Sequence, residues 1–152
     1  MPAGYRIPAR YNRIMINAKI PDLQLLPDIF RSYSGIRAVY LFGSQASGRT
    51  HRESDLDLAI VPGGPAVRGQ KVDILTDLAR RGFVDVDLVF LDTVDVVLKF
   101  EAVRHNRLIY CVDDFDSSAF YSLTLRQYWD FVPYLDIQRK AYKQRILQNG
   151  TR

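Results

Sequence analysis

The pattern of hydrophobic and polar residues divides the chain into strand-like runs and segments with helical spacing. Ile36–Phe42 and Asp55–Val61 are short runs rich in β-branched, aliphatic and aromatic residues, a composition typical of strands. Residues 83–91 form a third run of this kind. Gly43 follows the first run and Pro62 follows the second, and both residue types punctuate secondary structure. We therefore expect three strands.

Apolar residues with helical spacing lie before, between and after these runs. The first helix is expected to begin at about Leu26, because Pro27 fits only the first turn of a helix. A second helix is expected near residues 70–81, and a third over about residues 93–106. Helices that alternate with strands in this way predict an α/β (α+β) fold, in which helices pack on a mixed sheet.

Residues 114–148 carry the longest helical pattern. Its apolar residues recur at intervals of three and four positions: Tyr121, Leu125, Tyr128, Val132, Leu135, Tyr142 and Ile146. A helix of this length reaches roughly 50 Å, longer than a small domain is wide, and Pro133 is expected to kink it or split it. Packing of one helix face on the core of the domain explains this row of apolar residues. Further aromatic residues between positions 120 and 134 favour a second contact, with a partner chain.

The length of 152 residues predicts one domain, with residues 1–21 as an N-terminal arm and 114–148 as a helical tail. The first ten residues are expected to form a loose basic arm. Residues 13–20 alternate in part, and are a candidate for an extra edge strand.

Composition points to a soluble globular protein, with 47% hydrophobic and 25% charged residues. No apolar run approaches the ~20 residues of a membrane span, and no signal-peptide pattern opens the chain. The single cysteine, Cys111, cannot form an internal disulfide, which fits a cytoplasmic protein, and it is expected to be buried. The net charge of +4 is a mild basic excess. The chain lacks the basic and aromatic pattern of nucleic-acid grooves, so we expect no direct nucleic-acid ligand.

The candidate chemistry lies where the first two strand-like runs meet. Gly43-Ser44 ends the first run, and Asp55-Leu56-Asp57 opens the second ten residues later. Alternate strand residues share a face, so Asp55 and Asp57 point the same way, roughly 6.6 Å apart along the strand. Paired carboxylates suit Mg²⁺ or Mn²⁺, and a Gly-Ser turn offers backbone N–H groups and a hydroxyl to phosphate. The blander interpretation is a simple turn followed by solvated strand-edge charges.

The polar loop between these motifs contains two arginines, Arg49 and Arg52. Either can steady a triphosphate or a leaving pyrophosphate, and surface arginines on a polar loop are the equal alternative. The third strand contributes Asp85 and Asp87, which alternate onto one face. If it lies beside the second strand, about 4.8 Å away, three carboxylates converge.

With these motifs in view, the segment Gly43–Leu58 resembles the signature of the minimal nucleotidyltransferases of the polymerase-β superfamily. This superfamily carries a third carboxylate on a later strand, in a run that resembles Val84–Leu91. By position Asp87 matches that carboxylate best, and Asp85 is the fallback. The resemblance implies a polymerase-β-like nucleotidyltransferase fold with Asp55, Asp57 and Asp87 as metal-binding catalytic residues.

The small size and the aromatic tail resemble the MntA-type antitoxins of HEPN–MNT toxin–antitoxin pairs. This resemblance implies a prokaryotic enzyme that transfers AMP from ATP to a tyrosine of its HEPN-domain ribonuclease toxin and so silences it. Two alternatives share parts of the pattern. One is an antitoxin that acts by occlusion alone, through its aromatic tail. The other is a small-molecule nucleotidyltransferase of the aminoglycoside-modifying kind, which normally has an added helical domain.

Overall fold

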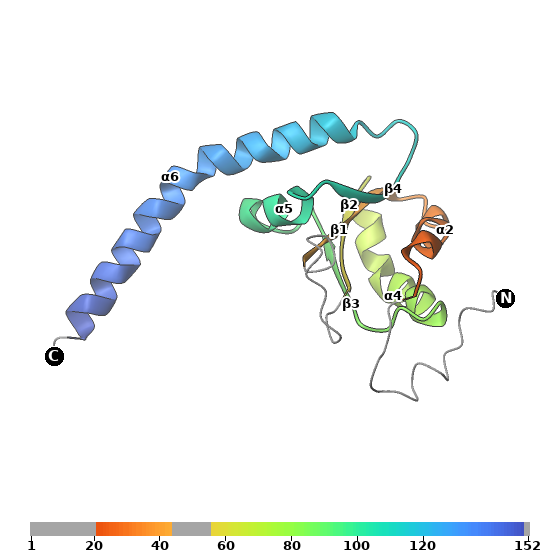
Figure 1. Cartoon of the computed structure of the whole chain (residues 1–152), viewed down its shortest axis with the longest axis horizontal. Helices are drawn as coiled ribbons and strands as arrows, with labels where there is room; N and C mark the ends of the chain where they lie inside the picture. The colour runs from red at the N-terminus through yellow and green to blue at the C-terminus, as the bar shows by residue number, and fades with distance from the viewer. Residues whose placement is uncertain (1–20, 44–55, 151–152) are drawn as a thin grey trace.

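The computed structural model describes residues 21–43 and 56–150 (Figure 1). The expected N-terminal arm, residues 1–21, lies outside the described residues except for Pro21, and so does the whole of the expected edge strand. In chain order the elements are η1 Leu23–Leu25, α2 Leu26–Arg31, β1 Ile36–Phe42, β2 Leu56–Pro62, η2 Pro65–Gln70, α4 Lys71–Arg80, β3 Val86–Phe90, α5 Val96–Val103, β4 Arg107–Cys111 and α6 Ser117–Asn149.

In the part of the chain that the structure describes, four strands form one mixed sheet in the order β3-β2-β1-β4. The central strand β1 pairs antiparallel with both β2 and β4, whereas β2 and β3 are parallel. A parallel pair needs a crossover connection, and the segment that contains η2 and α4 supplies it. The expectation of a mixed sheet with helices packed on it is confirmed, including the adjacency of the second and third strands.

Helices cover both faces of the sheet, because the strands are apolar on both sides. On one face α2 and α4 pack against alternate strand residues in a core that includes Leu26, Phe30, Val39, Leu41, Leu58, Ile60, Ile74, Leu78 and Leu88. On the other face α5 and the start of α6 cover Ala38, Tyr40, Phe42, Ala59 and Val61. We call this second side the α5 face; Figure 1 shows α5 and α4 on opposite sides of the strands.

The predicted helices are found where expected, with shorter ends. The first helix begins at Leu26, as expected, and ends at Arg31. The helix expected near residues 70–81 is α4, Lys71–Arg80. The strand expected over residues 83–91 is limited to Val86–Phe90. The expectation that Cys111 is buried is wrong: its side chain is exposed, because it ends the edge strand β4, which the hydrophobic pattern did not reveal.

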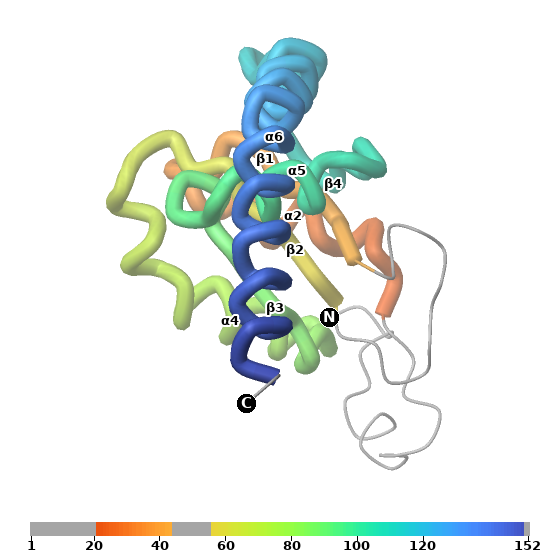
Figure 2. The backbone as a smooth tube through the Cα atoms, turned by 90° about the vertical axis from the view of Figure 1, so that its left-hand side faces the viewer, coloured from red at the N-terminus to blue at the C-terminus, as the bar shows by residue number. Residues whose placement is uncertain are grey.

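The C-terminal helix α6 runs without interruption from Ser117 to Asn149, with Pro133 inside it. Proline does not split the helix, and Figure 1 shows α6 changing direction partway along its length. Its first half packs on α5, where the rings of Phe100 and Tyr128 stack 3.9 Å apart. Its second half extends away from the sheet. In Figure 2, which is turned by 90° from Figure 1, this half therefore points toward the viewer and overlaps the strands. No helix of residues 21–43 and 56–150 has the length and apolarity to cross a membrane.

Candidate active site

The end of β1 and the starts of β2 and β3 meet at one end of the sheet. Phe42 pairs with Asp57 across the antiparallel β1–β2 ladder, and Asp57 pairs with Asp87 across the parallel β2–β3 ladder. The backbone N–H of Leu56 donates to the carbonyl oxygen of Asp85 at 2.9 Å, which fixes the start of this ladder. Three residues named from the sequence, Gly43, Asp57 and Asp87, are therefore brought to one end of the sheet.

The Asp57 carboxylate lies against the backbone of Gly43, where a side chain would have to be. Its φ of +70° is rarely adopted by residues with a side chain. A Cβ placed on Gly43 would lie 2.1 Å from Oδ2 and 3.0 Å from Cγ of Asp57. Both the conformation and the space require glycine here, and the result is a carboxylate held against the backbone at the end of β1.

Asp57 and Asp87 point to the same side of the sheet, because directly paired residues of neighbouring strands share a face. That side is the α5 face, since Asp57 alternates with Leu58 and shares its direction with Ala59 and Val61. Asp57 is half-buried and Asp87 is exposed. The register thus places Asp87, the residue that the sequence favoured, directly beside Asp57, whereas Asp85 lies before the start of β3.

Two carboxylates on neighbouring strands, about 4.8 Å apart at their backbones, repel each other unless a cation or a proton lies between them. This donor set is of the hard oxygen type that binds Mg²⁺ or Mn²⁺. No group of three potential metal ligands occurs within residues 21–43 and 56–150. The expected third ligand, Asp55, lies outside the described residues, as do Ser44, Arg49 and Arg52.

Sequence reasoning missed one basic residue at this end of the sheet. Arg107 opens β4 and pairs with Leu41, two residues before Gly43. Leu41 belongs to the core beneath α2 and α4, so Arg107 lies at the same end as Asp57 but points to the other face. Nothing in the hydrophobic pattern could identify it, because β4 itself was not predicted.

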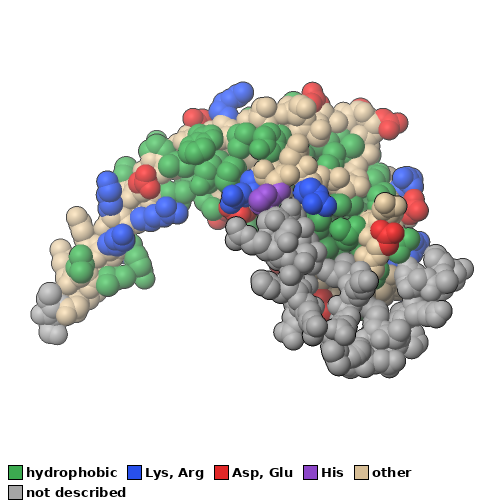
Figure 3. Space-filling view, viewed as in Figure 1, with side chains coloured by type: hydrophobic (Ala, Val, Ile, Leu, Met, Phe, Trp, Pro, Cys, Tyr) green, Lys and Arg blue, Asp and Glu red, His purple; other side chains and the backbone are tan. Residues whose placement is uncertain are grey.

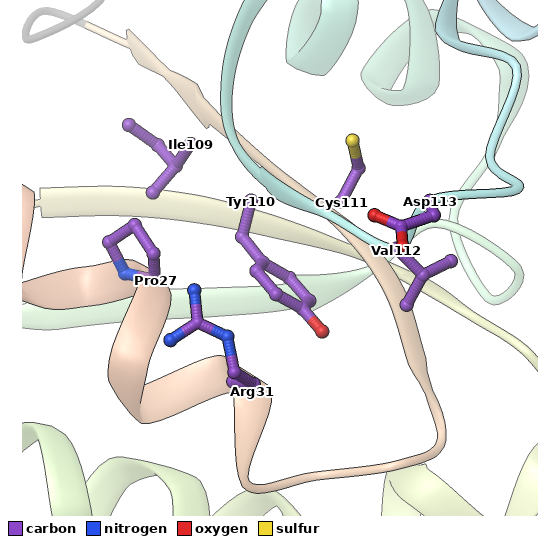
Figure 4. A pocket seen from close by; sticks show the side chains of 7 residues that line it. All are labelled: Pro27, Arg31, Ile109, Tyr110, Cys111, Val112 and Asp113. Carbon is purple, nitrogen blue, oxygen red and sulfur yellow. The ribbon is translucent and has the colours of Figure 1, made fainter.

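An open pocket between α2 and β4 lies away from the carboxylates. Figure 4 shows its lining residues: Pro27, Arg31, Ile109, Tyr110, Cys111, Val112 and Asp113. Cys111 pairs with Ala38, near the start of β1, and so belongs to the opposite end of the sheet from Asp57. Arg31, its principal charge, is paired with Asp28 of the same helix. The pocket therefore adds no group to the candidate site.

Comparison with known proteins identifies the family of this chain. Residues 24–115 match the family described as Polymerase beta, Nucleotidyltransferase. The protein adenylyltransferase MntA of Shewanella oneidensis is 27% identical over 135 residues, which cover 89% of this chain and 84% of the relative.

Solved structures share the fold. A toxin–antitoxin crystal structure with AMP-PNP has a TM-score of 0.60 and 24% identity, and the match covers 82% of this chain and 96% of that chain. A tri-AMPylated Shewanella oneidensis HEPN toxin in complex with MNT antitoxin has a TM-score of 0.57 and 21% identity, covering 82% and 95%. The family match spans more than half of the sequence and includes the strands that carry Asp57 and Asp87; this chain therefore belongs to the polymerase β nucleotidyltransferase family.

Proposed function

We propose that this protein is a Mg²⁺-dependent adenylyltransferase antitoxin, which transfers AMP from ATP to a tyrosine of a HEPN-domain toxin. The observation that carries the proposal is the Asp57–Asp87 pair beside Gly43, at the end of the sheet where the family motif lies. Three similarities support the substrate classes: the MntA relative is named a protein adenylyltransferase, one structure of this fold contains AMP-PNP, and another contains an AMPylated HEPN toxin.

The proposed reaction forms one bond and breaks one. The tyrosine oxygen attacks the α-phosphorus of ATP, and the bond to the pyrophosphate oxygen breaks. Asp87 accepts the proton of the hydroxyl. The backbone N–H groups at Gly43 and Ser44, with the Ser44 hydroxyl, bind the phosphates. Most of the barrier reduction comes from positioning and from neutralised charge.

Asp55, Asp57 and Asp87 are the proposed ligands of the divalent ion. When bound, this ion neutralises negative charge on the triphosphate and orients it for transfer. Arg49 and Arg52 are proposed to neutralise the departing pyrophosphate. The site of action is proposed to be the cytoplasm, where both ATP and a ribonuclease toxin would be found.

Neutralisation by occlusion is the second candidate, and the exposed apolar surface of α6 favours it. The two candidates are separated by mass spectrometry of a purified HEPN-domain toxin, after incubation with the purified chain, ATP and Mg²⁺. Adenylyl transfer predicts AMP on a tyrosine of the toxin, and no AMP when EDTA is present. Occlusion predicts an unmodified toxin that is nevertheless inhibited.

A further inference from the structure

Several large apolar side chains of α6 are exposed to solvent. Six large apolar side chains on α6 are each between 50% and 69% exposed: Trp129, Tyr134, Ile137, Tyr142, Ile146 and Leu147. Exposed patches of this extent commonly mark an interaction surface. A helix of about 17 residues that projects alone is also marginally stable in water, so a partner would stabilise it.

Three of these side chains share one side of the helix. With 3.6 residues per turn, Tyr134, Tyr142 and Ile146 fall within about a third of the helix circumference, on the same side as Leu135. Trp129, Ile137 and Leu147 point in other directions. We call Tyr134, Tyr142 and Ile146 the distal α6 face. Figure 3 shows hydrophobic side chains exposed along α6.

The charges on this half of α6 argue for a partner that differs from the chain itself. Between residues 134 and 149 there are four basic side chains, Arg139, Lys140, Lys143 and Arg145, against one acidic side chain, Asp136. Two copies that pack through this segment would bring like charges together. A partner surface that is apolar and flanked by acidic groups complements it.

The course of α6 places such a partner on the side of the sheet that carries the carboxylates. The first half of α6 is attached to the α5 face, where the rings of Tyr40 and Phe120 stack 6.0 Å apart. Asp57 and Asp87 point to that same face. A protein that contacts the distal α6 face therefore lies on the side from which a hydroxyl reaches the Asp57–Asp87 pair.

We infer that the distal α6 face is the docking surface for the acceptor protein, the HEPN-domain toxin, and that it holds the toxin beside the carboxylates. This inference rests on the proposed function for the identity of the partner. The toxin surface that it contacts is apolar and bordered by acidic side chains.

The test replaces Tyr142 and Ile146 by aspartate in the full-length chain. Gln144→Asp is the matched control, because it adds the same side chain to the same segment on a different side of the helix. Affinity for a purified HEPN-domain toxin is measured by calorimetry, and affinity for AMP-PNP is measured in parallel. Circular dichroism checks that helical content is retained.

The double variant is expected to bind the toxin at least about tenfold more weakly, with unchanged AMP-PNP affinity, and the control is expected to bind normally. Unchanged toxin affinity in the double variant overturns the inference. The inference is also overturned if the double variant changes only in its self-association, measured by sedimentation, or only in its binding to RNA in the absence of toxin. A wild-type chain that binds the toxin through this face but transfers no AMP leaves the docking surface standing and refutes the proposed function instead.

Discussion

Gly43 and Asp57 lie so close together that a Cβ on Gly43 would be 2.1 Å from Oδ2 of Asp57. The two residues come from different strands, and their contact joins the turn that is proposed to bind phosphate to a carboxylate that is proposed to bind metal. The antiparallel pairing of Phe42 with Asp57 fixes this contact. Any side chain at position 43 therefore acts on the carboxylate directly.

Gly43→Ala tests this contact. Alanine at a φ of +70° costs about 1–2 kcal/mol, and its methyl group displaces the Asp57 carboxylate. We expect adenylyl transfer to fall by at least about tenfold, a barrier increase of about 1.4 kcal/mol, and thermal stability to fall as well. Gly64→Ala is the control, because a Cβ there meets no atom within 4 Å and its φ is extended. Full activity in Gly43→Ala would contradict the close contact.

The third carboxylate is tested by comparing Asp87→Asn with Asp85→Asn. Asp87 pairs with Asp57 in the parallel ladder, whereas Asp85 contributes its backbone carbonyl to that ladder. We expect turnover to fall at least about 100-fold in Asp87→Asn, in the range of a lost catalytic base, and less than about tenfold in Asp85→Asn. Single-turnover rates with labelled ATP measure the difference. The reverse order would assign the role to Asp85.

Tyr40 predicts how stability depends on alkaline pH. Its side chain is fully buried, and its hydroxyl has no hydrogen-bond partner among the described residues. Burial, and to a lesser extent Cys111, raises the pKa of Tyr40 from 10.0 to about 12. The folded protein therefore keeps this proton when the unfolded chain has lost it, and Tyr40 lowers the free energy of unfolding progressively between pH 10 and about 12.

Tyr40→Phe removes both the buried hydroxyl and this titration. At pH 7 we expect the free energy of unfolding to stay unchanged or to rise by up to about 1 kcal/mol, because an unpaired polar group is removed. Between pH 10 and 12 the variant should lose less stability than the wild type. Urea denaturation at several pH values measures both effects, and equal slopes for the two proteins would show that Tyr40 does not titrate in this window.

Pro133 makes the middle of α6 a weak point. Proline has no N–H to donate to the carbonyl group four residues earlier, that of Trp129, and its ring crowds that position. Pro133→Ala is expected to restore this bond and to slow hydrogen exchange of the amides in the second half of α6 by about tenfold or more. Exchange measured by mass spectrometry checks this, with Ala141→Gly as a control that should act in the opposite direction. Unchanged exchange would mean that Pro133 does not weaken the helix.

The spacing of apolar residues predicted those strands and helices whose ends are marked by glycine or proline in the sequence. The strand Ile36–Phe42 was recoverable because it is apolar and ends at glycine, and α4 was recoverable from its helical spacing. The strand β4 was missed because none of its five residues is fully buried, whereas β3, also a five-residue edge strand, has two buried residues. The continuity of α6 through Pro133 was also not predictable. The spacing of apolar residues indicates one continuous helix there, whereas proline indicates a kink or a break.

For the site, sequence spacing named Gly43, Asp57 and Asp87, but it could not supply their neighbours. The parallel register that pairs Asp57 with Asp87 depends on a crossover through α4, and the steric contact of Gly43 with Asp57 depends on the β1–β2 register. Both are long-range properties. The direction of Arg107 is a third example, because it follows from its pairing with Leu41.

The central claim is that Asp57 is required for adenylyl transfer, and the most direct measurement is the rate of AMP transfer from α-labelled ATP to the toxin by Asp57→Asn. Asp113→Asn is the matched control, because it changes an exposed carboxyl at the opposite end of the sheet. We predict a fall of at least about 1,000-fold for Asp57→Asn, about 4 kcal/mol of lost transition-state stabilisation, with unchanged toxin binding and a normal rate in the control. A rate within about tenfold of the wild type in Asp57→Asn would contradict the account.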